Sequence, residues 1–377
     1  MVYFDYSATT PVLPEIMDSL IKVTNEYLGN PNSLHNLGTK SKKLMNEAIA
    51  QIADIFKINQ SEIVFTSGAT EANNYAILGA FLAKGKKGSR IIVSKLEHDS
   101  IYGICEHLES LGYIVDYVKN DEEGLIDFED LKRLITPETI LVSICAVNSE
   151  LGIRQPLKII KQIINRENPN TLLHSDMTQA IGKISISLSD VDLASMSAHK
   201  IYGPKGIGLL YKKDNVKIRP LIYGNKKDFK PGTPALPLIA SFSKALRITN
   251  TDINIKEEKV NKLNEKMCNI LAEYPKLLIN KTKYSIPHIL NFSLMNIKPE
   301  TLIHALEVHK IYVSSNTACA SGKISNAVLN IYHDKTRALT TIRISLSFLT
   351  KNEEITRFSN IFKKVYINLS GLNHETV

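Results

Sequence analysis

Lys200 is followed by three closely spaced glycines in the segment SAHKIYGPKGIG, residues 197–208. A lysine can form a Schiff base with a carbonyl group, and glycines allow other backbone to come close beside it. A surface lysine before a turn is the alternative interpretation. A dinucleotide-binding loop is not, because the glycines are spaced GxxGxG and come after the lysine instead of opening a helix after a first strand.

Other candidate site residues follow, within four positions, short apolar, β-branched segments that we predict to be strands. They are Ser67, Gly68, Ala69 and Thr70 after EIVFT (62–66), His98 after RIIVS (90–94), Asn148 after ILVSICAV (140–147), Asp176 and Gln179 after TLLHS (171–175), and Ser197, Ala198, His199 and Lys200 after DLASM. In open α/β sheets, ligands bind beyond the carboxyl ends of the strands. We therefore expect these residues to share one site.

Each of these residues also has a simpler interpretation. His98 can be a packed or solvated histidine, Asn148 can satisfy loop backbone, and Asp176 can cap a turn. Serine and threonine at a helix start are ordinary N-caps. Their convergence on one edge of one sheet favours a common site over separate coincidences.

The combination suits pyridoxal phosphate. This cofactor needs a lysine for a Schiff base, a carboxylate at its ring nitrogen, a group over the ring face and a phosphate site. Lys200, Asp176 and His98 suit the first three roles, and Gln179 suits the phenolic oxygen. The phosphate site is predicted from the free N–H groups at a helix start and from Thr70, Ser197 and His199.

Strand and helix patterns alternate from residue 60 to 211, which predicts an α/β fold with a largely parallel sheet covered by helices. The expected strands are 62–66, 90–94, 113–118, 140–147, 171–175, 192–197 and 206–211. After about residue 253 a long charged helix (254–273) begins a smaller α+β part. We predict a large domain at 12–253 and a small domain made of 1–11 and 254–377.

Composition limits the function classes. The 377 residues carry a net charge of +8, part of it from a lysine-rich stretch at 205–230. That stretch is either a surface for anions, acidic proteins or RNA, or a solvated face. We favour the solvated face because no nucleic-acid motif accompanies it, and we expect no direct nucleic-acid binding.

The cysteines and histidines argue against a metal site and a disulfide framework. Cys105, Cys145, Cys268 and Cys319 are far apart in the chain, and the histidines lack the spacing of zinc ligands. Together with the absence of a membrane-length apolar run, this predicts a cytoplasmic protein with no membrane contact.

Several segments resemble those of the cysteine desulfurases, the class V aminotransferase branch of the fold-type I pyridoxal-phosphate enzymes. The segments are YFDYSATTPVLP, GNPNSLHNLG, EIVFTSGATEANN, KLEHDS, VNSELGIRQP, HSDMTQAIGK and SAHKIYGPKGIG. The resemblance extends from about residue 3 to about residue 360. It implies a fold-type I architecture with a large cofactor-binding domain and a smaller one.

The resemblance also implies a reaction. L-cysteine would displace Lys200 from the cofactor, with His98 and the displaced Lys200 as candidates for moving protons. Cys319, in SSNTACASG, would then attack the substrate sulfur as a thiolate. The products would be alanine and a persulfide on Cys319 that passes to a sulfur acceptor, such as an iron–sulfur scaffold or a tRNA-thiolation enzyme.

Three further residues take roles by resemblance. Arg343, in TIRISL, matches an arginine that binds the substrate carboxylate as a bidentate fork, and Asn148 would assist near that carboxylate and the ring. Thr233, in KPGT, matches a residue that reaches the phosphate of the neighbouring subunit. A homodimer with shared active sites is therefore expected.

The sequence departs from the family pattern before Thr233. In YGNKKDFKPGT, Lys230 and Pro231 replace an arginine and a serine, and Asn316 and Thr317 replace a glycine and a serine before Cys319. These differences leave two alternatives open. One is a related lyase or aminotransferase, such as a selenocysteine lyase. The other is a weakly active paralogue that serves as a binding partner in sulfur trafficking.

Overall fold

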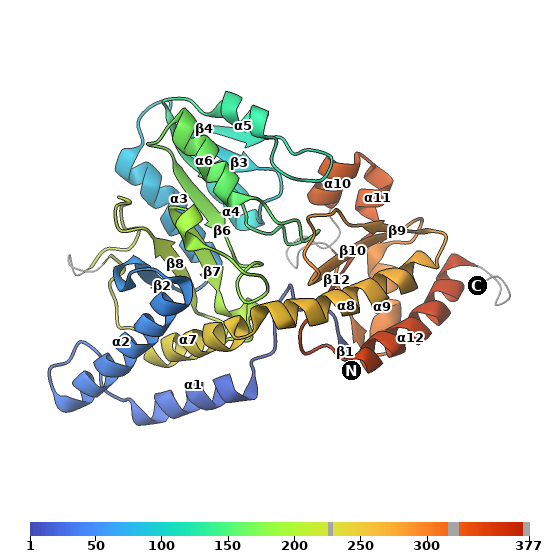
Figure 1. Ribbon diagram of the computed structural model, residues 1–377, viewed down its shortest axis with the longest axis horizontal. Helices are drawn as coiled ribbons and strands as arrows, with labels where there is room; N and C mark the ends of the chain where they lie inside the picture. The colour runs from blue at the N-terminus through green and yellow to red at the C-terminus, as the bar shows by residue number, and fades with distance from the viewer. Residues whose placement is uncertain (225–228, 316–323, 372–377) are drawn as a thin grey trace.

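The computed structural model describes residues 1–224, 229–315 and 324–371. Its main element is a seven-stranded sheet with the order β2-β8-β7-β6-β5-β3-β4 (Figure 1). The strands are β2 Ile63–Thr66, β3 Arg90–Ser94, β4 Ile114–Val118, β5 Thr139–Ser143, β6 Leu172–Asp176, β7 Leu193–Ser197 and β8 Gly208–Lys212. Neighbours are parallel except where β8 pairs with β2 and β7. The predicted mostly parallel α/β sheet is confirmed.

Helices cover both faces of this sheet, and the strand residues alternate between them. Ile91 and Val93 of β3 belong to the apolar cluster on one face, whereas Ile92 belongs to the cluster on the other. The first face is covered by α3 Ala69–Lys84 and α4 Asp99–Ser110. The second cluster takes in α1 Pro14–Glu26, α2 Asn36–Phe56, α5 Phe128–Leu134, α6 Leu157–Glu167 and α7 Leu236–Asn250.

The C-terminal part is built on an antiparallel sheet with the order β12-β10-β9. Its strands are β9 Leu277–Asn280, β10 Ile289–Leu294 and β12 Thr341–Ser345, and its helices are α8 Ile253–Ala272, α9 Pro299–Glu307, α10 Asn326–Tyr332, α11 Lys335–Leu339 and α12 Asn352–Ser370. The N-terminal strand β1 (Val2–Tyr3) pairs in parallel with β11 (Ile311–Tyr312). Phe4 lies in the apolar cluster of this C-terminal part. The domain bounds at 12 and 253 stay a prediction.

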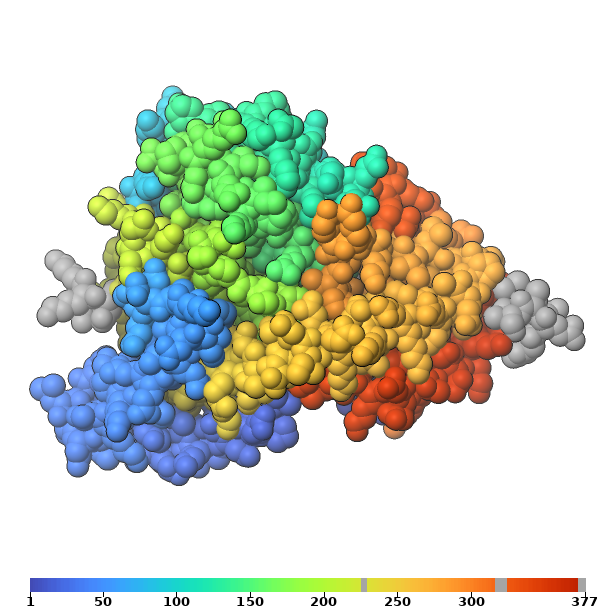
Figure 2. Space-filling model, viewed as in Figure 1, coloured from blue at the N-terminus to red at the C-terminus, as the bar shows by residue number. Residues whose placement is uncertain are grey.

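The two parts are joined along one line of helices. Figure 1 shows α7 and α8 following one another across the molecule, from the large sheet to the small one. In the space-filling view the C-terminal part, gold to red, packs directly against the green and blue surface of the large sheet (Figure 2). None of the helices in the described ranges is long and apolar enough to cross a bilayer.

Two strands differ from their predicted bounds by more than one residue at an end. The strand expected at 140–147 ends at Ser143, because β3 already ends at Ser94 and its pairing with β5 stops there, although Ile144 and Ala146 still donate to β6. The strand expected at 206–211 begins at Gly208 and runs antiparallel, because the chain reverses through a turn in which Gly206 has φ +87°. β8 therefore starts at the edge where β7 ends.

Candidate active site

A cavity of about 610 Å³ lies where β6 and β7 end, and residues from both parts of the chain line it. The N-terminal segment contributes Ser7, Ala8 and Thr9, and β12 contributes Arg343. Of the residues predicted from sequence, those that line the cavity are Ala69, Thr70, His98, Asp176, Gln179, Ser197, His199, Lys200 and Arg343. The expectation that groups after separate strands share one site therefore matches the arrangement of most of them.

Three other predicted residues do not line the cavity, and the structure does not describe a fourth. Asn148 is buried and both ends of its amide serve the backbone: Nδ2 donates to Leu96 O at 3.0 Å, and Oδ1 accepts from the N–H groups of Glu150 and Leu151. Asn148 therefore satisfies loop backbone, which is the simpler of the two interpretations of this residue. Ala198 is buried against Gly203, Thr233 is exposed, and Cys319 lies outside the described residues. The roles of all four stay predictions.

Lys200 ends a short 3₁₀ turn, Ala198–Lys200, directly after β7. Its Nζ donates to the carbonyl oxygens of Ser7 and Ala8 at 2.6 and 2.7 Å. Both of these acceptors are neutral carbonyl groups. The two contacts hold the N-terminal segment against the edge of the large sheet.

Asp176 is the last residue of β6 and is only 8% exposed. Its Oδ2 accepts from Asn73 Nδ2 at 2.9 Å, and its Oδ1 accepts from the backbone N–H of Thr178 at 2.9 Å. Neutral donors stabilise a carboxylate without neutralising it. A buried carboxylate held in this way suits a protonated ring nitrogen of a ligand.

The start of α3 opens on the cavity and has no side-chain cap. Uncapped N–H groups at a helix N-terminus attract anions such as phosphate. Glu71 in this first turn accepts from the N–H of Ser67 at 2.6 Å and forms an ion pair with Lys230 at 2.9 Å. Burial raises the pKa of Glu71, but the hydrogen bonds from Ser67 and the pairing with Lys230 outweigh it and lower that pKa overall.

The two cavity histidines are fixed through their Nδ1 atoms. His98 caps α4, accepting from the N–H of Ser100 at 3.1 Å. His199 Nδ1 lies 3.2 Å from Thr9 Oγ1. Burial, followed by the charges of Lys200 and Lys205, lowers the pKa of His199 to about 4. His199 is therefore neutral near pH 7.

The glycines after Lys200 bring backbone segments together at the cavity. A Cβ on Gly208 would lie 2.6 Å from the Cα of Gly68 and 2.5 Å from the carbonyl oxygen of Met196. A Cβ on Gly203 would lie 2.9 Å from that of Ala198. Gly206, with its positive φ, makes the turn into β8. These glycines therefore let the start of α3 approach the end of β7.

Arg343 is 1% exposed, and its guanidinium is already well bonded. Nη1 donates to Ser149 O at 3.0 Å, and Nη2 donates to Asp5 Oδ1 at 3.1 Å and to Ser314 Oγ at 2.9 Å. Its Nε has no partner among the described residues. The predicted bidentate contact to a substrate carboxylate would therefore require part of this set to be exchanged.

Sequence reasoning missed several polar neighbours of these groups. Ser7 and Ala8 hold Lys200, and Asn73 holds Asp176. All three stand in segments already notable for their motifs, YFDYSATTP and TSGATEANN. Lys183, four residues after Gln179, is buried and donates to it at 2.5 Å. In QAIGK, the four-residue spacing between Gln179 and Lys183 could have indicated from the sequence that the two side chains meet.

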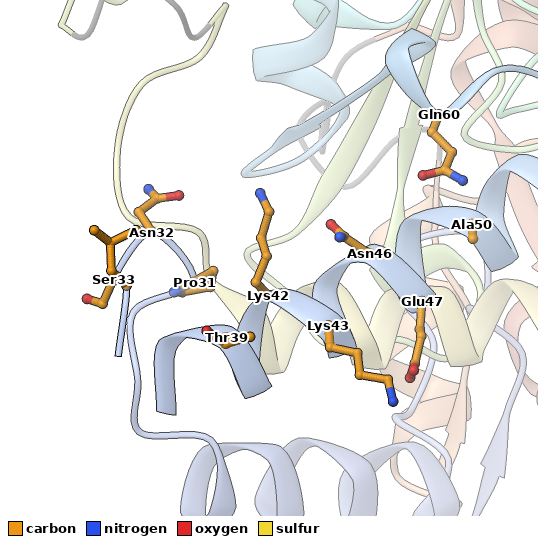
Figure 3. A pocket seen from close by; sticks show the side chains of 11 residues that line it. Pro31, Asn32, Ser33, Thr39, Lys42, Lys43, Asn46, Glu47, Ala50 and Gln60 are labelled. Carbon is orange, nitrogen blue, oxygen red and sulfur yellow. The ribbon is translucent and has the colours of Figure 1, made fainter. Parts of the chain in front are cut away.

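A second hollow lies away from these residues. It measures about 680 Å³ and is bounded by the loop at 31–34, α2 and Gln60 (Figure 3). Of its lining residues on α2, Lys42 points to one side of the helix, and Lys43 and Glu47 point to the other (Figure 3). None of the predicted site residues lines it. Its larger volume therefore does not make it the better candidate.

The cavity at the end of the large sheet fits pyridoxal phosphate. Its lining residues Ser7, Thr178 and Arg343 each carry a buried polar atom (Oγ, Oγ1 and Nε) without a partner among the described residues. Such atoms indicate a polar ligand. The cavity volume lies within the usual range for small-molecule sites, and the donor set combines a lysine, a buried carboxylate and an uncapped helix start.

Comparisons with known proteins identify the family of this chain. Residues 2–358 match the aminotransferase class-V family. The chain is 40% identical over 384 residues to a "NifS/IcsS protein homolog" of Lactobacillus delbrueckii subsp. bulgaricus, covering 99% of both chains. It is 37% identical over 374 residues to "Cysteine desulfurase IscS" of Clostridium botulinum, covering 97% of this chain and 94% of the relative.

A solved "NifS-like protein" superimposes with a TM-score of 0.92 at 34% identity, covering 98% of this chain and all of the other. The fold and the family expected from the sequence motifs are thereby confirmed. The chain belongs to the aminotransferase class-V family, whose enzymes depend on pyridoxal phosphate.

Proposed function

We propose that this chain is a pyridoxal-phosphate-dependent cysteine desulfurase, which converts L-cysteine to L-alanine and leaves a persulfide on Cys319. One observation carries the proposal most directly. Lys200, Asp176 and the uncapped start of α3 line the same cavity. The names of the relatives favour cysteine desulfuration over the other reactions of the family.

Each cavity residue has a definite task in this proposal. Bound pyridoxal phosphate supplies an electron sink for bonds at the substrate α-carbon. Lys200 would hold it covalently, Asp176 would keep its ring nitrogen protonated, and Gln179 would donate to its phenolic oxygen. His98 would lie over the ring. The phosphate would bind at Ala69 and Thr70, with Ser197 and His199 beside them.

The substrate would be held and cleaved by the remaining groups. Arg343 would bind the carboxylate of L-cysteine, and Lys200 and His98 would transfer protons. The carbon–sulfur bond of the substrate breaks, and a sulfur–sulfur bond to Cys319 forms. L-cysteine and the Cys319 thiol thus become L-alanine and a persulfide, which balances without an external oxidant.

The assembly and setting form part of the same proposal. The exposed position of Thr233 is compatible with a contact to the cofactor of a second subunit in a homodimer. The persulfide would pass to a sulfur-acceptor protein in the cytoplasm. An iron–sulfur scaffold and a tRNA-thiolation enzyme both have the required chemistry.

The test is to load the purified protein with pyridoxal phosphate and add L-cysteine, recording the visible spectrum, alanine and reductant-dependent sulfide together. We expect a yellow protein whose band shifts and which forms both products. Lys200→Ala should lose the covalent band. Cys319→Ala should keep the band and lose sulfide, whereas Cys268→Ala, a half-buried thiol on α8, should change neither.

The other outcomes point to different functions. A protein that remains colourless with pyridoxal phosphate contradicts the proposal at the cofactor. A yellow protein that acts on selenocysteine without needing Cys319 would be a lyase. A yellow protein that forms no alanine would be the weakly active paralogue.

A further inference from the structure

Lys183 is a buried lysine in the turn after β6. It is 7% exposed, and its Nζ lies 2.5 Å from Oε1 of Gln179, one helical turn earlier in the sequence. The preceding Gly182 has φ +63°, and a Cβ there would lie 2.6 Å from Thr249 Oγ1. Packing against α7 therefore fixes the turn that presents Lys183.

The other end of the Gln179 amide faces the cavity side. Its Nε2 donates to Ser7 O at 2.9 Å, and the same carbonyl accepts from Lys200 Nζ at 2.6 Å. Lys183, Gln179, Ser7 and Lys200 thus form one continuous chain of hydrogen bonds. Gln179 and Lys200 both line the cavity, whereas Lys183 stands behind them.

An ammonium group determines which way an amide must point. It has only donors, so it can meet the oxygen of Gln179 but not the NH2 group. The carbonyl oxygen of Ser7 already favours Nε2 at the cavity end of this amide, and Lys183 reinforces that orientation by donating to Oε1 at the other end. With Lys183 in place, Nε2 is the end that remains for the cavity.

The surroundings of Lys183 give no sign of an ion pair. No carboxylate within the described residues pairs with it. Burial, followed by the charges of Lys200 and Arg343, lowers its pKa well below the ordinary value. Its neighbour His288 is also buried, and its pKa is lowered to about 3 by burial and by Lys183. The contact to Gln179 Oε1 does not depend on that charge, because a neutral amine also donates through its N–H groups.

We propose that Lys183 is a positioning residue whose Nζ donor holds the Gln179 amide with its Nε2 group toward the phenolic oxygen of pyridoxal phosphate. This inference rests on the proposed function, because it assigns the ligand that Nε2 meets. Lys183 acts through Gln179 and need not touch the ligand.

Lys183→Met tests this in the full-length protein reconstituted with pyridoxal phosphate. We expect binding of the cofactor to weaken about tenfold, as for loss of one hydrogen bond to a charged oxygen. The pH midpoint of the visible band should rise by about one unit, because a donor to the phenolic oxygen stabilises its negative charge. Lys161→Met is the control: it also removes a lysine with a 2.5 Å contact, to Asp192, but away from the cavity. It should change neither readout.

A double-mutant cycle separates positioning from a general effect of removing a charge. In a Gln179→Ala background, Lys183→Met should add little to either readout, because the group it orients is gone. If the two substitutions are additive, the inference is wrong. Should Lys183→Met not fold, Lys183→Gln takes its place, since a glutamine can donate or accept and no longer selects one orientation. It should raise the band midpoint in the same direction.

Failure of the inference is distinguishable from failure of the proposed function. A wild-type protein that binds no pyridoxal phosphate overturns both. A wild-type protein that binds it, with Lys183→Met binding equally well and showing the same band midpoint, overturns only the role of Lys183.

Discussion

Asp176 and Asp192 are both buried carboxylates beside the large sheet, but one lies where β6 ends and the other just before β7 begins. Asp192, 6% exposed, forms an ion pair with Lys161 at 2.5 Å. Asp176, 8% exposed, instead accepts hydrogen bonds from the neutral donors of Asn73 and Thr178.

A similar contrast holds for two further charges, although the cavity-lining residues Glu71 and Arg343 do form ion pairs, with Lys230 and Asp5. At the amino edge, Arg90 pairs with Asp116 at 2.8 Å. At the cavity edge, the buried Lys183 donates to the neutral amide of Gln179. Ion pairs neutralise buried charge within the fold, whereas neutral partners leave the charge available to a ligand. The edge where Asp176 and Lys183 have neutral partners is therefore the one built for chemistry.

The largest effect is expected from removing one charge at each edge. Asp176→Asn should lower the rate of alanine formation at least about a hundredfold, because an amide does not keep the ring nitrogen protonated. Its free energy of unfolding should fall by only about 1 kcal/mol, because no ion pair within the described residues is broken and the amide oxygen can keep one of the two hydrogen bonds from Asn73 and Thr178. Activity and urea unfolding, measured on the same preparation, check both statements.

Asp192→Asn is the matched variant, and its pattern should be the reverse. Lys161 would lose its carboxylate in a mostly buried position, so the free energy of unfolding should fall by about 2 kcal/mol. The folded protein should retain its activity. If Asp192→Asn abolished activity while Asp176→Asn did not, the contrast between the two edges would be wrong.

The next effect concerns the close backbone contact at the cavity edge. Gly208→Ala places a Cβ against backbone atoms of Met196 and Gly68, which cannot move aside as a side chain would. We expect it to lower the free energy of unfolding by about 2–3 kcal/mol and to weaken cofactor binding, because Gly68 opens α3. Urea unfolding and titration with pyridoxal phosphate measure these two effects.

Gly103→Ala provides the comparison within a helix. Gly103 lies in α4, and apart from the adjoining residues and the backbone of its own helix no described atom lies within 4 Å of the position that a Cβ would take. Alanine there should therefore stabilise the protein by up to about 1 kcal/mol. Equal effects of the two substitutions would show that the contact between Gly208 and Gly68 is unimportant.

Sequence patterns predicted the cavity residues that come directly after a strand. Asp176 and Ser197 end β6 and β7, and Lys200 comes one short turn later. The position of Asn148 was harder to predict, because β5 ends at Ser143, four residues before the predicted end of that strand. Asn148 therefore lies on a loop beyond the sheet, and that loop uses its amide.

Lys183, Ser7 and Ala8 could not be found from the residues that come directly after each strand. The burial of Lys183 depends on a turn packed against α7, and Ser7 meets Lys200 only because the N-terminal segment crosses to the large sheet. Such contacts join residues far apart in sequence. The predicted domain arrangement brings these segments of the chain near one another, but it does not say which of their atoms form hydrogen bonds.

The smallest effect is expected at Glu97, a buried carboxyl group near the cavity whose hydrogen bonds come from neutral donors. Glu97 is buried beside Leu96 and Cys145, and its Oε1 accepts from Ser94 Oγ at 2.5 Å and from the Cys145 N–H at 2.7 Å. Burial is the main cause that raises the pKa of Glu97 to about 8, with Asp176 adding to it against the lowering effect of the hydrogen bonds.

The sign of the resulting pH dependence comes from proton linkage. Between its ordinary pKa of 4.5 and its folded value of about 8, Glu97 holds a proton in the folded chain that it lacks in the unfolded chain. Its contribution to stability is complete below 4.5 and is lost as the pH rises through 8. Relative to Glu97→Gln, the wild-type protein should lose stability with rising pH by up to about 1.4 kcal/mol per unit.

Urea unfolding of both proteins at pH 5, 6.5 and 8, chosen as roughly even steps across this window, measures that difference. Glu258→Gln, an exposed carboxyl group on α8 paired with Lys262, should show no such trend. A parallel pH dependence for wild type and Glu97→Gln would mean that Glu97 is ionised at all three values. In that case Glu97 would be a second buried anion, in addition to Asp176, whose hydrogen bonds come from neutral donors. The cavity edge would then hold two carboxylate charges that no ion pair within the described residues neutralises.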